Sequence, residues 1–154
     1  MTAPDPSLPP STPQGLPDRG SLLISNHHPG VDHFIDEVVR GLERHSYPKA
    51  SVFAVRLSLH EALTNAFMHG HRGLPPGTPI RVEFDISDPR AQFAVEDKGP
   101  GFKPQELPDP TAEENIELAH GRGIMLIRAY MTSVSFNERG NRLEMVYHRP
   151  APKA

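Results

Sequence analysis

Residues 80–86 alternate strictly between apolar and charged side chains. A period of two places the apolar residues on one face of a β-strand and the charged residues on the other. This strand therefore belongs to a sheet with one buried face and one face in water. Because only the buried face needs cover, we expect helices on that side alone, which gives an α+β fold of two layers.

Two segments before this strand carry apolar residues at helical spacing. One covers residues 31–42. The other begins near Pro48, since proline is tolerated in the first turn, and ends at Gly70, which can adopt a left-handed C-cap. A third helix is expected to open at Gly121. Four further short segments predict strands: residues 21–25, 91–96, 134–137 and 143–147. The predicted order is β-α-α-β-β-loop-α-β-β.

Prolines gather at the N-terminus, where residues 1–20 hold six of the chain's 18. Such a stretch buries too little apolar surface to offset its ordering entropy, so we expect a disordered tail over residues 1–20. A proline-rich ligand for an aromatic groove is the functional alternative. The folded domain is predicted over residues 21–149, followed by a short tail at residues 150–154.

Composition excludes several classes of protein. A length of 154 residues fits one domain, and the absence of cysteine excludes disulfides and thiolate metal sites. A formal charge of −3 with scattered basic residues gives little support for binding nucleic acid. Neither an apolar run long enough to span a membrane nor a secretory signal is visible, so we expect no membrane contact and a cytoplasmic protein.

Three polar side chains share one face of the second predicted helix. Glu61, Asn65 and His69 are spaced four residues apart, away from the apolar stripe. A carboxylate and an amide oxygen on one face suit a hard cation such as Mg²⁺. An ordinary solvated helix face is the alternative.

Two glycine-rich segments follow. Asp97 comes directly after a predicted strand, and Gly99 and Gly101 let the backbone turn sharply and approach a ligand closely. Gly121 and Gly123 stand at a predicted helix start, where free N–H groups and the helix dipole favour a phosphate. Taken singly, each segment is also compatible with a simple turn or helix entry.

In this order and spacing, the three segments resemble the nucleotide-binding boxes of the GHKL ATPase superfamily. The motif Glu-Ala-x-x-Asn-Ala-x-x-His-Gly over residues 61–70 is similar to that of one branch of this superfamily, the anti-sigma factor serine kinases. The resemblance covers residues 21–149. It implies the Bergerat fold, a two-layer α/β sandwich with a mixed, mostly antiparallel sheet and helices on one face.

The resemblance also implies a role for each matching residue. Asn65 would bind Mg²⁺, Glu61 would act as general base, and Asp97 would accept a hydrogen bond from the adenine amine of ATP. Glycines would let the base, sugar and phosphates lie close to the backbone: Gly99, Gly101, Gly121 and Gly123. Arg122 would add a cation near the phosphates, and residues 102–120 would form a proline-rich lid. The last hairpin commonly carries a threonine near the adenine in this family, whereas residues 140–143 contain none.

The implied partners are a sigma factor, held inactive by a dimer of the kinase, and an anti-anti-sigma protein of the STAS type that is phosphorylated on serine. A non-catalytic ATP-binding interaction module of the same fold is the main alternative. A metal hydrolase using His60, His69 and His71 is a further one, although their spacing is not that of a known zinc motif.

Overall fold

Five strands form one sheet in the order β1-β2-β3-β5-β4. Their bounds are β1 (Arg19–Ile24), β2 (Ile80–Ile86), β3 (Arg90–Glu96), β4 (Ser133–Phe136) and β5 (Arg142–His148). The computed structural model describes residues 16–25, 28–71, 73–75, 77–99 and 119–151, without the side chains of residues 28, 29, 69 and 119–122. Every strand pairing within these ranges is antiparallel, whereas a mixed, mostly antiparallel sheet was expected.

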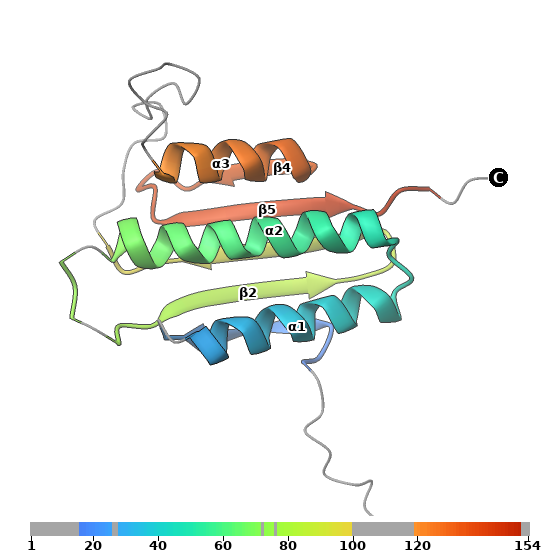
Figure 1. Cartoon of the computed structure of the whole chain (residues 1–154), viewed down its shortest axis with the longest axis horizontal. Helices are drawn as coiled ribbons and strands as arrows, with labels where there is room; N and C mark the ends of the chain where they lie inside the picture. The colour runs from blue at the N-terminus through green and yellow to red at the C-terminus, as the bar shows by residue number, and fades with distance from the viewer. Residues whose placement is uncertain (1–15, 26–27, 72, 76, 100–118, 152–154) are drawn as a thin grey trace, which may run out of the picture.

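Three helices lie side by side on one face of this sheet (Figure 1). They are α1 (His28–Arg44), α2 (Lys49–Asn65) and α3 (Ala119–Tyr130), and a π-helical turn, η1 (Ala66–Gly70), extends α2. The element order and the two-layer α+β arrangement predicted from the sequence are therefore confirmed. None of the helices in the described part of the chain is long and apolar enough to cross a membrane.

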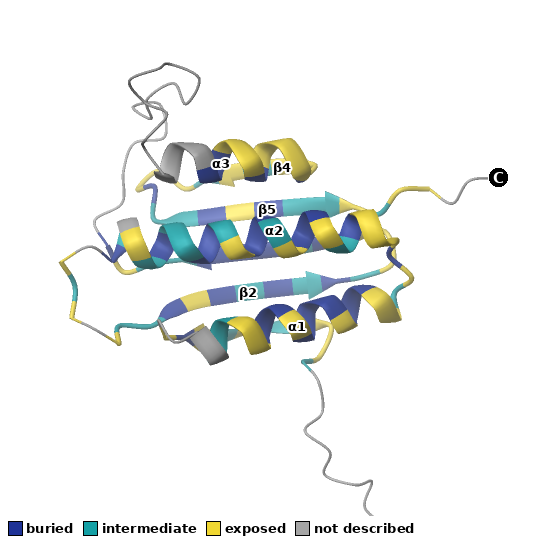
Figure 2. Ribbon diagram, viewed as in Figure 1, coloured by how far each residue is buried: buried dark blue, intermediate teal, exposed yellow. Residues whose placement is uncertain are grey.

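The core lies between the helices and the sheet, where dark blue marks the inward residues of both layers (Figure 2). The apolar residues of β2 all point into it, while the charged residues between them lie on the opposite face. On that opposite face Arg142 pairs with Glu83, Glu96 and Glu144. The alternation along residues 80–86 thus separates a dry face from a charged, solvated one, as predicted.

The C-terminal end of α2 departs from the prediction. His71 N–H donates to the carbonyl of Ala66, five residues back, at 2.9 Å, so the helix closes in a π turn. Gly70 was expected in the left-handed region, but the glycines with positive φ in the described residues are Gly73, Gly77 and Gly140. The left-handed C-cap at Gly70 is therefore wrong, and this glycine serves a close contact instead.

Two other boundaries also shift. α3 begins at Ala119, so Gly121 lies in its first turn rather than opening it. β1 begins at Arg19, and the Leu16 N–H donates to the Glu37 carboxylate at 3.2 Å. The sheet therefore takes in residues that the sequence assigned to the N-terminal tail.

Candidate functional site

Glu61 and Asn65 lie one turn apart near the C-terminal end of α2, as predicted. The amide nitrogen of Asn65 is buried and has no hydrogen-bond partner among the described residues. A buried donor without a partner is rare in folded proteins, because its desolvation is not compensated. An acceptor that binds beside this amide would satisfy it.

Gly123 brings α3 against these two side chains. A Cβ added at position 123 would stand 2.9 Å from Asn65 Nδ2, 3.2 Å from Asn65 Oδ1 and 3.0 Å from Glu61 Oε2. No side chain fits there without moving them. The first and third motifs, 60 residues apart in sequence, therefore meet in the fold as expected.

The position of Gly123 corrects one detail of its expected role. Only the first four N–H groups of a helix lack a partner within the helix. Because α3 begins at Ala119, Gly121 belongs to this first turn and Gly123 does not. Gly123 serves by the absence of a side chain, whereas the N–H of Gly121 is one of the four that have no acceptor within the helix.

Asp97 follows β3 directly and is held by the last hairpin. Its N–H donates to the carbonyl of Asn141 at 2.9 Å, and Asn141 Nδ2 donates to its carbonyl at 3.0 Å. The Asp97 carboxylate accepts the N–H of Gly99 at 2.7 Å. The turn after β3 thus orients a carboxylate by backbone contacts on both sides.

Two glycines allow this turn to pack against the end of α2. A Cβ at Gly70 would overlap the Asp97 carboxylate, and a Cβ at Gly99 would overlap the carbonyl oxygen of Gly70. Gly70 and Gly99 therefore serve a close backbone approach, which no other residue permits. Through this contact the helix that carries Asn65 and the strand that carries Asp97 are joined at one end of the molecule.

The packing changes the electrostatics of Asp97. Burial raises the pKa of its carboxyl above the usual value, because desolvation disfavours the charged form. The hydrogen bond from the Gly99 amide and the charge of Arg139 oppose this rise, and Glu96 adds to it. A carboxyl with a raised pKa at a glycine-lined turn is typical of a functional position.

The metal hydrolase alternative finds no support in these residues. Within the part of the chain that is described, no group of three or more His, Asp or Glu side chains could hold a metal ion. His60 is exposed, and His71 is buried with its Nε2 atom accepting the N–H of Lys98 at 2.9 Å. The hydrogen bond between His71 and the turn after β3 was not predicted from the sequence. The sequence showed only that a histidine stands near the end of a predicted helix.

Several predicted features lie outside the described residues. They are Gly101, most of the expected lid over residues 102–120, and the side chains of His69 and Arg122.

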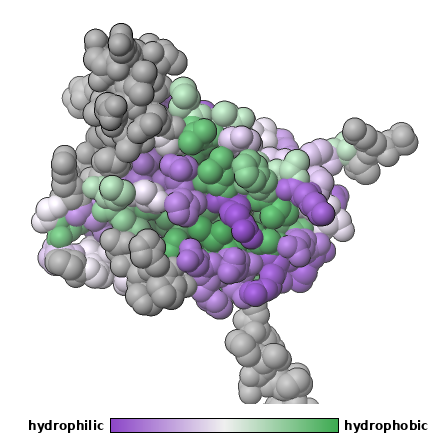
Figure 3. Space-filling view, in the orientation of Figure 1, coloured by the Kyte–Doolittle hydropathy of each residue, from purple (hydrophilic) through white to green (hydrophobic). Residues whose placement is uncertain are grey.

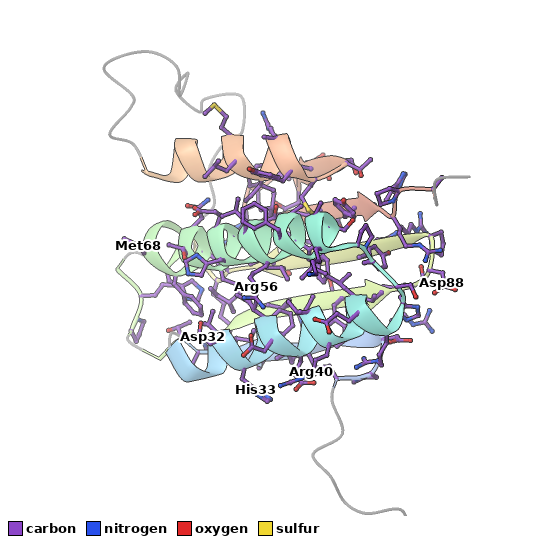
Figure 4. All side chains as sticks on the ribbon, turned by 45° about the vertical axis from the view of Figure 1, so that its right-hand side comes forward. Asp32, His33, Arg40, Arg56, Met68 and Asp88 are labelled. Atoms are coloured by element: carbon purple, nitrogen blue, oxygen red, sulfur yellow. The ribbon has the colours of Figure 1, made fainter. Side chains whose placement is uncertain are left out.

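A groove between α1 and α2 is lined by none of the predicted site residues. It has a volume of about 500 Å³ and is lined by Asp32, Ile35, Asp36, Phe53, Arg56, Leu57 and His60. Figure 4 shows Asp32 on α1 and Arg56 on α2 along its two sides. Figure 3 shows apolar side chains gathered on this face, in line with the exposure of Phe53 and of Tyr130, whose rings are 5.7 Å apart.

The site thus combines a carboxylate and an amide on α2, two glycines in the N-terminal half of α3, and a carboxylate at the end of β3. A family model described as the histidine kinase-like ATPase domain matches residues 27–147. The chain belongs to this family. The match spans all three motifs and both layers of the fold, and membership implies an ATP-binding domain.

Among curated proteins, the chain is similar to the anti-sigma F factor of Clostridium beijerinckii. The two are 28% identical over 96 residues, which is 60% of this chain. The match spans 66% of that relative, just under two thirds of its length. Together with the family model, this confirms the predicted resemblance to the anti-sigma branch of the histidine kinase-like ATPases.

Proposed function

We propose that this protein is a Mg²⁺- and ATP-dependent protein serine kinase that acts as an anti-sigma factor. The observation that carries the proposal is the approach of Gly123 to Glu61 and Asn65, which puts the N-terminal half of α3 beside a carboxylate and a buried amide without a partner among the described residues. Membership of the histidine kinase-like ATPase family and the similarity to an anti-sigma F factor support it.

The residues around Asn65 fit a metal-bound triphosphate. The amide oxygen of Asn65 is a hard ligand of the kind that Mg²⁺ prefers, and its amide nitrogen offers a donor to a phosphate oxygen. Gly121 and Gly123 leave room for phosphates beside the α3 terminus, and Arg122 would add positive charge. Bound Mg²⁺ would neutralise charge on the phosphates during transfer.

The adenine of ATP would lie in the other half of the site, near Asp97. The Asp97 carboxylate is half-buried and oriented by the Gly99 amide, so it is suited to accept a hydrogen bond from the exocyclic amine of adenine. Gly99 and Gly101 would let the base and sugar approach the backbone. The expected threonine of the last hairpin is absent, and Asn141 instead fixes the backbone of Asp97.

Glu61 would act as the general base. In the transfer step the oxygen of a partner serine forms a bond to the γ-phosphorus, and the bond from that phosphorus to the β–γ bridging oxygen breaks, leaving ADP. The serine proton passes to the Glu61 carboxylate. Since phosphoryl transfer depends mostly on positioning and charge neutralisation, one base beside a metal ligand suffices for this chemistry.

The proposed partners are those implied by the resemblance to anti-sigma factor serine kinases, and the similarity to an anti-sigma F factor supports them. They are a sigma factor, bound by a homodimer of this chain, and an anti-anti-sigma protein of the STAS type that carries the acceptor serine. All of them would act in the cytoplasm. Nucleic acid and membrane are not proposed as partners. The domain that does this work is proposed to span residues 21–149.

Phosphate transfer tests the proposal. The protein is incubated with Mg²⁺ and γ-labelled ATP, together with a STAS-type protein from the same genome. We expect label on a serine of that protein, and Glu61→Gln should bind ATP normally while transfer falls by about 10²-fold or more. Glu43→Gln, an exposed carboxylate of α1, is the matched control.

Two results would contradict the proposal. Equal transfer by the natural protein and Glu61→Gln would remove Glu61 as the base. ATP binding without transfer to any STAS-type protein of that genome would favour the non-catalytic interaction module.

A further inference from the structure

His71 is a buried histidine that the proposed chemistry leaves without a task. It follows the π turn η1 directly, and only 9% of its surface is exposed. Its ring packs edge-on against Phe67, with centroids 6.0 Å apart and planes at 83°. A buried imidazole normally has a specific hydrogen-bond partner, because leaving it unpaired is unfavourable.

The partner of His71 is the turn that follows β3. His71 Nε2 accepts the backbone N–H of Lys98 at 2.9 Å. A ring nitrogen that accepts a hydrogen bond carries no proton, so this contact requires the neutral imidazole with its proton on Nδ1. The structure therefore uses His71 as an acceptor, which is a different task from binding a metal or transferring a proton.

Lys98 lies between the two residues of this turn that are joined by a hydrogen bond. Asp97 precedes it and Gly99 follows it, and the Asp97 carboxylate accepts the Gly99 N–H. β3 has ended at Glu96, so the Lys98 amide lies beyond the last residue of the strand. The imidazole of His71 takes the place of a strand partner and holds the middle of the turn.

The π turn supplies the geometry for this contact. A π turn holds one more residue than an α-turn, which shifts every later side chain by about 100° around the helix axis. His71 N–H closes the π turn on Ala66, and the same residue's side chain reaches Lys98. π turns are frequent at functional sites, and here the turn aims an acceptor at the end of β3.

We infer that His71 is a positioning residue for nucleotide-base recognition. Its neutral ring holds the Lys98 amide and so fixes the orientation of the Asp97 carboxylate toward an adenine amine. The inference rests on the proposed function, in which Asp97 reads the base. It predicts an effect on base discrimination, because Asp97 lies in this turn whereas Asn65 lies on α2.

Two variants separate the hydrogen bond from the packing. His71→Phe keeps a ring against Phe67 but has no acceptor, and His71→Gln keeps an acceptor that can reach the Lys98 amide. His33→Gln is the matched control, because His33 is exposed on α1 (Figure 4). For each variant, calorimetry gives the Kd of Mg-ATP and of Mg-GTP, and hydrogen exchange gives the protection of the Lys98 amide.

We expect His71→Phe to weaken ATP binding by about tenfold and to reduce the preference for ATP over GTP by a similar factor. The Lys98 amide should exchange faster in this variant. His71→Gln should restore affinity, preference and protection, and His33→Gln should match the natural protein.

Other outcomes overturn the inference. If His71→Phe keeps both the ATP affinity and the preference, the ring does not position the base-reading turn. If both His71 variants lose affinity for ATP and GTP equally, the loss does not come from reading the base, and the positioning role fails. If the natural protein binds no ATP, the proposed function and the positioning role both fail, while Lys98 protection that is lost in His71→Phe still reports the hydrogen bond itself.

Discussion

Gly123 in α3 lies so close to Asn65 in α2 that a Cβ at position 123 would stand 2.9 Å from the Asn65 amide nitrogen. Real Cβ atoms essentially never come under 3.0 Å from a neighbour, so one of the two groups would have to shift. The two residues come from different motifs of the sequence, and their contact joins α3 to the polar face of α2.

Gly123→Ala tests this contact. We expect ATP binding to weaken by about tenfold or more, because the added methyl group displaces Asn65 and Glu61 from their positions. The fold should survive, since alanine favours a helix interior over glycine by about 1 kcal/mol. Titration with Mg-ATP and a thermal melt measure the two effects. Arg128→Ala, exposed on the same helix, is the control, and unchanged ATP affinity in Gly123→Ala would argue against the proposed phosphate site.

Asn65→Ala should separate stability from binding. The variant removes a buried donor that has no partner among the described residues, so the free energy of unfolding without ligand should fall by no more than about 1 kcal/mol. The stabilisation produced by Mg-ATP should disappear, because a ligand stabilises only the protein that binds it. Urea unfolding with and without Mg-ATP measures both quantities, with Thr64→Ala as the neighbouring control. A large loss of stability without ligand would instead assign Asn65 a structural role.

Asp97→Asn should change the dependence of stability on pH. Burial raises the pKa of Asp97 in the folded state above its ordinary value of 3.8. Such a group favours the folded state at low pH, and this contribution is lost as pH rises through the folded pKa. At pH 7 the variant should therefore be at least as stable as the natural protein, and its advantage should vanish as pH falls toward about 4. Unfolding curves across this range test the sign, and a variant that is less stable at pH 7 would contradict it.

His45 lies far from the candidate site. Its charged form is favoured in the folded state, whereas the charged form of Asp97 is disfavoured there. Its Nδ1 atom lies 2.6 Å from Asp88 and its Nε2 atom 2.9 Å from Asp18. Figure 4 shows Asp88 at the end of the molecule opposite Met68, which lies in η1. Two carboxylates on one ring favour the imidazolium, so the hydrogen bonds that the ring donates to Asp88 and, as the smaller effect, to Asp18 raise the pKa of His45 above 6.5.

This stabilisation is fully present below the unfolded pKa of His45 and is lost as pH rises through the folded pKa. The natural protein should therefore lose stability between about pH 6.5 and the folded pKa, and His45→Gln should not show this slope. Salt should reduce the effect, since the carboxylates are exposed. Urea unfolding at several pH values measures it. Parallel pH profiles for the two proteins would show that the contacts carry no net stability.

The sequence predicted the order of all strands and helices because each segment has a clear period. The alternation over residues 80–86 required a sheet covered on one side, and the structure has that sheet. The meeting of Asn65 and Gly123 was also expected, although only from a resemblance to a family. Nothing in the local pattern of either segment states which distant residue it contacts.

Contacts that depend on tertiary packing were beyond the sequence. The π turn after Asn65 has no signature in residues 66–70, and the prediction of a left-handed Gly70 failed because a glycine can serve either a turn or a close approach. Because the Asp97 carboxylate lies so close to Gly70, this glycine serves a close approach and not a left-handed turn. Likewise His71 was visible as a histidine near a helix end, but its bond to the Lys98 amide depends on where β3 stops.

Calorimetric titration of the natural protein with ATP in the presence of Mg²⁺ tests the central claim most directly, alongside Asn65→Ala and Asp97→Ala. We predict binding with a Kd in the micromolar range for the natural protein and its loss in both variants, since one residue serves each half of the nucleotide. Absence of binding in the natural protein, or equal binding in all three, would contradict a nucleotide site built from these residues.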